Sequence, residues 1–109
     1  MNYLKIKKNT DFQKLFKGGK RIFSPCITLI YFPSNKLRFA IALSKKHGKA
    51  VVRNRIKRLI RESFRLNCNL LNKNYSIIAL PKVMEEYSFK NFEKSIQTAI
   101  KKLNQCEKK

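Results

Sequence analysis

The stretch from Lys45 to Arg65 constrains this chain more than any other part of its sequence. It carries nine lysines and arginines and one acid, Glu62. Its apolar residues recur with the period of an α-helix, so they share one arc of a helical wheel while the charges fill the opposite arc. The first arc holds Val52, Ile56, Leu59, Ile60, Ser63, Phe64 and Leu66. The stretch therefore predicts a helix over about residues 49–67, with one side packed on a core and the other strongly positive.

The basic arc of this helix suits a polyanion better than it suits plain solvent. Solvated helix faces usually mix charges, because Glu–Lys pairs four residues apart stabilise a helix. Here Lys57, Arg61 and Arg65 follow one another at that spacing with no acid between them. Like charges so placed destabilise an isolated helix, whereas a bound polyanion would neutralise them. Several of these residues are arginines, and the planar guanidinium group suits phosphate.

The whole chain shares this bias. It has 26 lysines and arginines against six acids, a formal net charge of +20 over 109 residues. Such a charge attracts polyanions, which makes nucleic acid the expected partner and an anionic membrane surface the second candidate. No apolar segment is long enough to cross a bilayer, and the N-terminus lacks the apolar core of a signal peptide. We therefore expect a cytoplasmic protein without a membrane partner.

The length suits one compact domain over residues 1–109, with residues 1–9 and 105–109 expected to be flexible. A short helix is predicted from about residue 10 to the terminator pair Gly18-Gly19. Three strands are predicted next, and the last is marked by alternation of apolar with small or polar residues. These strands span residues 21–23, 26–32 and 37–44.

After the basic helix, the sequence predicts a short apolar strand over residues 75–80 and then a last helix. Ser88 is the expected N-cap of that helix, and Tyr87 and Phe92 occupy hydrophobic-staple positions around it. The predicted order is α-β-β-β-α-β-α. The expected fold class is thus α+β, with a small mixed sheet packed by helices.

Groups that could carry catalysis are scarce. The adjacent Glu85 and Glu86 are explained by the favourable charge at the start of the last helix. His47 is the only histidine and has no triad partner, and the chain has neither a phosphate-binding loop nor the clustered carboxylates of two-metal nucleases. The cysteines are odd in number, widely spaced and without a zinc or disulfide pattern: Cys26, Cys68 and Cys106. We predict reduced thiols, no catalytic residue, and no metal or cofactor bound by the protein.

The order of the basic residues carries more information than their number. Their order resembles the signature of the bacterial ribonuclease P protein subunit: Ser44-Lys45-Lys46, Gly48, Ala50-Val51 and then RNRIKRLIRESF at 53–64. DFQKLFK at 11–17 is similar to the first helix of that family, and the resemblance runs from about residue 5 to residue 104.

This resemblance implies a function. Ribonuclease P is a ribonucleoprotein endonuclease that removes the 5′ leader of precursor tRNA, and its RNA subunit is the catalyst and holds the Mg²⁺ ions. The implied partners are that catalytic RNA and the 5′ leader, and not DNA. The protein would assist substrate binding, and would lower the need for Mg²⁺ by offsetting phosphate repulsion. The resemblance also implies a left-handed βαβ crossover, although about 98% of such units are right-handed.

The resemblance assigns residues to two sites. The expected RNA-binding residues lie on and before the basic helix: Lys45, Lys46, Arg53, Asn54, Arg55, Lys57, Arg58, Arg61 and Arg65. The expected leader cleft lies between the first helix and the sheet, where bases would stack on Phe12 and Phe16. Plain core packing is the alternative role for both rings.

The register of the strand beneath this cleft decides which of its side chains faces the cleft. Some members of the family place a strand aromatic residue in the cleft, whereas the register expected here places Ile30 there and Tyr31 on the other face. A shift of one residue would exchange the two. Ala40 and Ala42 are small and would leave room for the cleft.

Two other functions fit the charge. A structural RNA-binding protein of ribosomal type, without a role in tRNA processing, would be equally basic, but it does not predict the ordered motif together with the aromatic first helix. A helix-turn-helix DNA binder would need a second helix beside residues 49–67, and strand-like segments flank that helix instead.

Overall fold

The computed structural model describes residues 4–6 and 9–107. The elements in chain order are β1 (Leu4–Lys5), α1 (Asn9–Gly18), β2 (Lys20–Phe23), β3 (Ile27–Pro33), β4 (Arg38–Ile41), the 3₁₀ helix η1 (Lys45–His47), α2 (Ala50–Asn67), the 3₁₀ helix η2 (Cys68–Leu70), β5 (Tyr75–Pro81) and α3 (Phe89–Cys106). The predicted α+β class and the predicted order of the main elements are confirmed. No helix in the described ranges is long and apolar enough to cross a membrane.

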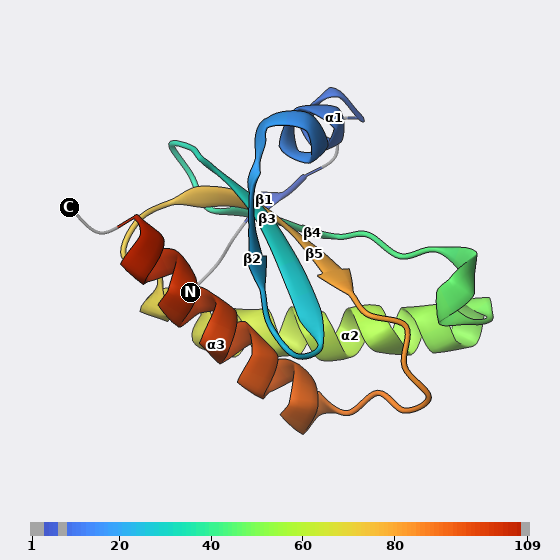
Figure 1. Ribbon diagram of the computed structural model, residues 1–109. Coiled ribbons are helices and arrows are strands. Elements are labelled where there is room, and N and C mark those ends of the chain that lie inside the picture. Colours follow the sequence, from blue (N-terminus) through green and yellow to red (C-terminus); the bar gives the residue numbers. More distant parts are fainter. Residues whose placement is uncertain (1–3, 7–8, 108–109) are drawn as a thin grey trace.

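The strands form one mixed sheet in the order β1-β4-β5-β3-β2. β3 pairs antiparallel with β2 and with β5, whereas β4 pairs parallel with β5 and with β1. Because β4 and β5 are parallel neighbours joined through α2, they form the expected βαβ unit. The left-handed sense of its crossover stays a prediction. Figure 1 shows α1 on one face of this sheet and α2 and α3 on the other.

The larger core lies under α2 and α3. Ile56, Ile60 and Phe64 follow one another on α2 at four-residue spacing, and all are fully buried. The Phe64 ring stacks on Phe39 of β4, with ring centroids 3.8 Å apart and an angle of 6° between the planes. This stack fixes α2 against the edge of the sheet, and thereby fixes where its opposite, charged side points.

A smaller core lies under α1 on the other face. It contains Leu15 of α1, Ile30 of β3 and Ile78 of β5, together with Ile6. The predicted register is confirmed, since Ile30 lies on this face and Tyr31 belongs to the larger core. At Gly19 an added Cβ would lie 2.5 Å from the Leu15 carbonyl oxygen and 2.6 Å from Ile30 Cγ2. Glycine therefore allows the chain leaving α1 to approach the sheet this closely.

Two strand ends differ from the expectation. Residues 4–6 were expected to be flexible, but Leu4 and Lys5 pair with β4 and the Ile6 side chain is buried. β4 ends at Ile41 rather than near residue 44. There the chain turns into η1, in which the Ser44 side chain accepts a hydrogen bond from the Lys46 N–H.

The C-terminal helix starts as predicted. The Ser88 side chain accepts a hydrogen bond from the Asn91 N–H, and the Tyr87 ring stacks on Phe92 at 5.9 Å. The helix ends where Glu107 accepts hydrogen bonds from Lys20 and from the Tyr31 hydroxyl, each at 3.0 Å. The Lys20 ammonium and then the Tyr31 hydroxyl lower the pKa of Glu107, whereas burial followed by the Glu107 carboxylate raises the pKa of Tyr31.

Candidate RNA interface

α2 has the two sides that its periodicity predicts. Its buried side is narrower than the wheel suggested, because the Val52 and Leu66 side chains are 38% and 49% exposed. Both residues lie near the ends of the helix, beyond the part that packs on Phe39. Ser63, on the buried side, donates a hydrogen bond to the Leu59 carbonyl at 2.8 Å, so its hydroxyl is satisfied within the helix.

The exposed side presents a row of guanidinium groups. Arg55, Arg58 and Arg61 recur every three residues and are all exposed. The prediction that no acid accompanies Lys57, Arg61 and Arg65 is wrong for Arg65, which forms an ion pair with Glu62 one turn earlier. The charge that this side offers to a partner is therefore concentrated on the first three arginines.

The basic pair before α2 is held in place by a histidine. Lys45 and Lys46 are exposed on η1, and the neighbouring His47 is buried. His47 Nδ1 accepts from the Ser44 N–H at 3.1 Å, and Nε2 lies 2.7 Å from the Pro81 carbonyl, to which it donates in the matching neutral tautomer. The histidine thus fixes the loop that carries the two lysines.

Arg53 and Asn54 line a cavity of about 370 Å³ at the start of α2, together with Ala42 and Leu43. The Arg53 side chain is half-buried, because its long aliphatic stem lies along the protein surface. Its Nε is fully buried and has no hydrogen-bond partner. A buried donor of this kind normally has an acceptor.

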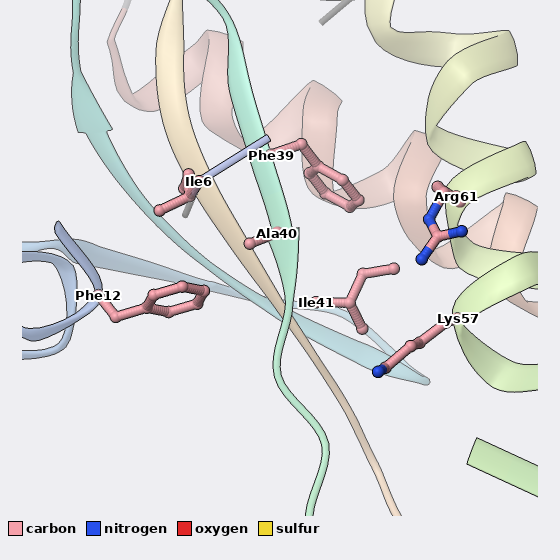
Figure 2. A pocket seen from close by; sticks show the side chains of 7 residues that line it. All are labelled: Ile6, Phe12, Phe39, Ala40, Ile41, Lys57 and Arg61. Atoms are coloured by element: carbon pink, nitrogen blue, oxygen red, sulfur yellow. The ribbon is translucent and has the colours of Figure 1, made fainter. Parts of the chain in front are cut away.

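A cleft of about 190 Å³ opens next to this cavity, around the part of β4 beyond its pairing with β1. Figure 2 shows the Phe12 ring of α1 reaching toward β4 from one side, and Lys57 and Arg61 of α2 reaching toward it from the other. Ala40 and Ile41 of β4 form the floor between them. β1 pairs with β4 only as far as Phe39, so no strand covers this part of the edge within the described residues.

The other two residues expected in the cleft lie elsewhere. Phe16 is 42% exposed and is not among the residues that line the cleft, because it points about 100° around α1 from the buried Leu15. Ile30 lies on the expected face but is fully buried beneath α1. Ile30 therefore supports the cleft from below, and the accessible surface comes from Phe12, Ala40 and Ile41.

The cleft joins an aromatic ring, a small aliphatic floor and two cations. Proteins that bind single-stranded nucleic acid combine these features, because bases stack on aromatic rings while cations neutralise the backbone. Lys57 and Arg61 belong at once to the basic side of α2 and to the wall of the cleft. No local pattern predicted that these two residues border the cleft. The alternation of Leu4 and Ile6 with lysines was the only signal for the β1 edge that helps to form it.

Comparison with known proteins identifies the family of this chain. The sequence model of the Ribonuclease P family matches residues 1–104. This chain belongs to the ribonuclease P protein family. It is 43% identical over 104 residues to the ribonuclease P protein component of Fusobacterium nucleatum, covering 88% of this chain and 93% of the relative. The corresponding protein of Clostridioides difficile is 39% identical over 102 residues, covering 89% of each chain.

Solved structures of the family share the fold. The ribonuclease P protein of Thermotoga maritima superimposes with a TM-score of 0.80 at 26% identity, over 90% of this chain and 96% of the other. The protein of Staphylococcus aureus gives a TM-score of 0.76 at 27% identity, over 94% and 96%. The resemblance found in the basic motif and the first helix is therefore confirmed across nearly the whole chain. Membership in this family makes the protein a subunit for tRNA processing and implies a partnership with the ribonuclease P RNA.

Proposed function

We propose that this protein binds the catalytic RNA with the basic side of α2 and binds the 5′ leader of precursor tRNA in the cleft beside it. The observation that carries the proposal is the cleft itself, where Phe12 faces Lys57 and Arg61 across β4. Both cations extend from the helix that presents Arg55 and Arg58 to a partner. One RNA bound on α2 and a single strand in the cleft would thus lie side by side.

In this proposal the protein supplies no catalytic group. Glu62 and Glu107, two of its six acids, form ion pairs with Arg65 and Lys20, and His47 is engaged in holding its loop. The catalytic RNA would hold the Mg²⁺ ions of the cleavage reaction. The protein would reduce the repulsion between the phosphates of substrate and catalyst, which lets the holoenzyme act at lower Mg²⁺. We place this assembly in the cytoplasm.

The cavity at the start of α2 would add a phosphate contact. The Arg53 Nε there has no acceptor from the protein, and Asn54 and Lys57 line the same cavity. A phosphate in this cavity would lie beside two cationic residues, Arg53 and Lys57. This supports a single strand that continues from the cleft toward the N-terminal end of α2.

Reconstitution tests the proposal. The full chain is added to the cognate catalytic RNA and precursor tRNA at low Mg²⁺, and leader removal is measured. We expect strong stimulation, and its absence would refute the proposal in favour of a purely structural RNA-binding role.

The cleft is tested by Phe12→Ala. We expect weaker binding of leader-bearing precursor tRNA and unchanged binding of mature tRNA, because only the leader reaches the ring. The loss is expected to be about tenfold, within the range found for one stacked base. Equal losses on both ligands would show that Phe12 serves only the core beneath α1.

A further inference from the structure

A second aromatic surface lies on the same face of the sheet as α1, beyond the cleft. The register aligns Phe32 of β3 with Ser76 of β5, and Ser76 with Arg38 of β4. The next row on this face lies two residues further along each strand and consists of Ile30, Ile78 and Ala40. α1 packs on that second row and leaves the first one open, so the Phe32 ring is 51% exposed.

The open row forms one wall of a cavity of about 490 Å³. The last turns of α1 form the opposite wall, with Lys14, Leu15 and Lys17. Ile6 lines both this cavity and the cleft that holds Phe12, so the two hollows adjoin. We call this cavity the Phe32 site and define it by Phe32, Ser76, Arg38, Lys14 and Lys17.

The chemistry of the Phe32 site matches the cleft. Lys14, Lys17 and Arg38 supply three cations, and no acid is among its lining residues. The exposed Phe32 ring offers a flat apolar face in the same cavity. An anionic chain that carries flat apolar groups fits this combination, and a single-stranded nucleic acid is such a chain.

We propose that the Phe32 site binds the part of the leader that extends beyond the cleft, with one base stacked on Phe32. This inference rests on the proposed function of the cleft. The direction follows from the position of α2, which contributes Lys57 and Arg61 to the cleft and no residue to the Phe32 site. Arg38 lies about 10 Å along β4 from Ile41. The Phe32 site would therefore hold nucleotides farther from the catalytic RNA, and hence farther from the cleavage point, than those in the cleft.

The test uses the holoenzyme with precursor tRNAs whose leaders are lengthened one nucleotide at a time. For the wild type we expect affinity to rise as the leader fills the cleft and to rise again when it reaches Phe32. In Phe32→Ala only the second rise should disappear, a loss of about tenfold for long leaders. Phe32→Tyr should keep the second rise. Phe32→Leu should lose it, because leucine keeps an apolar surface but offers no ring for stacking.

Phe23 provides a matched control. It is also an exposed phenylalanine of the sheet, at 62%, but it lies on β2 and pairs with Thr28, at the other end of β3 from Phe32. Phe23→Ala should leave both rises unchanged. The inference is overturned if Phe32→Ala matches the wild type at every leader length, if Phe23→Ala causes the same loss, or if Phe32→Ala weakens binding of mature tRNA equally.

The two proposals fail differently. If the dependence of affinity on leader length is lost in Phe12→Ala but unchanged in Phe32→Ala, only the Phe32 site is overturned. An affinity that depends on neither ring at any leader length would overturn the leader cleft, and the Phe32 site with it.

Discussion

Replacing single arginines on the exposed side of α2 tests most directly whether this side binds the catalytic RNA. Arg58→Ala and Arg61→Ala each delete one exposed charge without touching the buried side that packs on Phe39. Arg65→Ala is the comparison, because Arg65 is already paired with Glu62. All three variants should fold normally, which their thermal unfolding would verify.

The expected magnitude follows from counterion release. Each phosphate contact contributes about 0.9 to the slope of log affinity against log salt on a duplex, and about 0.7 on a single strand. When salt concentration rises fourfold, the dissociation constant of a variant that lacks one contact should therefore increase about threefold less than that of the wild type. We expect this loss for Arg58→Ala and Arg61→Ala, and about twice the change in slope for the double variant. Arg65→Ala should change the slope less, since Arg65 must leave Glu62 before it can reach a phosphate.

The measurement is equilibrium binding of the catalytic RNA over a series of salt concentrations. Glu62→Gln provides a variant of opposite sign, because it removes the carboxylate that pairs with Arg65 and should steepen the slope. Unchanged slopes for both Arg58→Ala and Arg61→Ala would refute the assignment of this side as the RNA-binding surface. A loss in Arg65→Ala as large as in Arg61→Ala would show that the pair with Glu62 opens on binding.

Two further predictions concern stability. Gly19→Ala should destabilise the fold by about 1–3 kcal/mol, a typical cost of overpacking, because its Cβ would meet the Leu15 carbonyl oxygen at 2.5 Å. Gly18→Ala should be neutral or slightly stabilising, because a Cβ there would have nothing within 4 Å. Equal urea midpoints for the two variants would contradict this packing. Glu107 has its pKa lowered mainly by Lys20, so its contribution to stability is present above the ordinary glutamate pKa and is lost as pH falls through the lowered value. Thermal unfolding across acidic pH should therefore be less pH-dependent in Glu107→Gln than in the wild type, and superimposable pH profiles would contradict this role.

Local patterns predicted the elements that depend on local physics. The four-residue spacing of Ile56, Ile60 and Phe64 defined α2 and its charged side, because the period of a helix is set within a few residues. Ser88 and Tyr87 marked the start of α3 for the same reason, since caps and staples act within one turn. The basic motif and the first helix identified the family before any contact was known.

Long-range packing decided what local patterns could not. The pairing of Leu4 and Lys5 with β4 joins strands more than thirty residues apart, and a two-residue strand has too little periodicity to be recognised. The cleft depends on how far around the sheet edge α2 reaches, which is set by the stack of Phe39 on Phe64. Phe16 and Ile30 were expected in the cleft, and they lie outside it or beneath it because Leu15 determines which side of α1 meets the sheet.

The same packing explains how one helix can serve two RNAs. The stack of Phe39 on Phe64 fixes the rotation of α2 about its axis, and the helical period then assigns each cation a direction. Arg58 lies on the exposed side without contributing to the cleft, whereas Lys57 and Arg61 border the cleft from the same helix. A small rotation of α2 would move the latter two away from β4 while leaving its total charge unchanged. In the proposed function, the aromatic core under α2 is therefore what aligns the leader with the catalytic RNA, although neither ring of the stack needs to contact RNA.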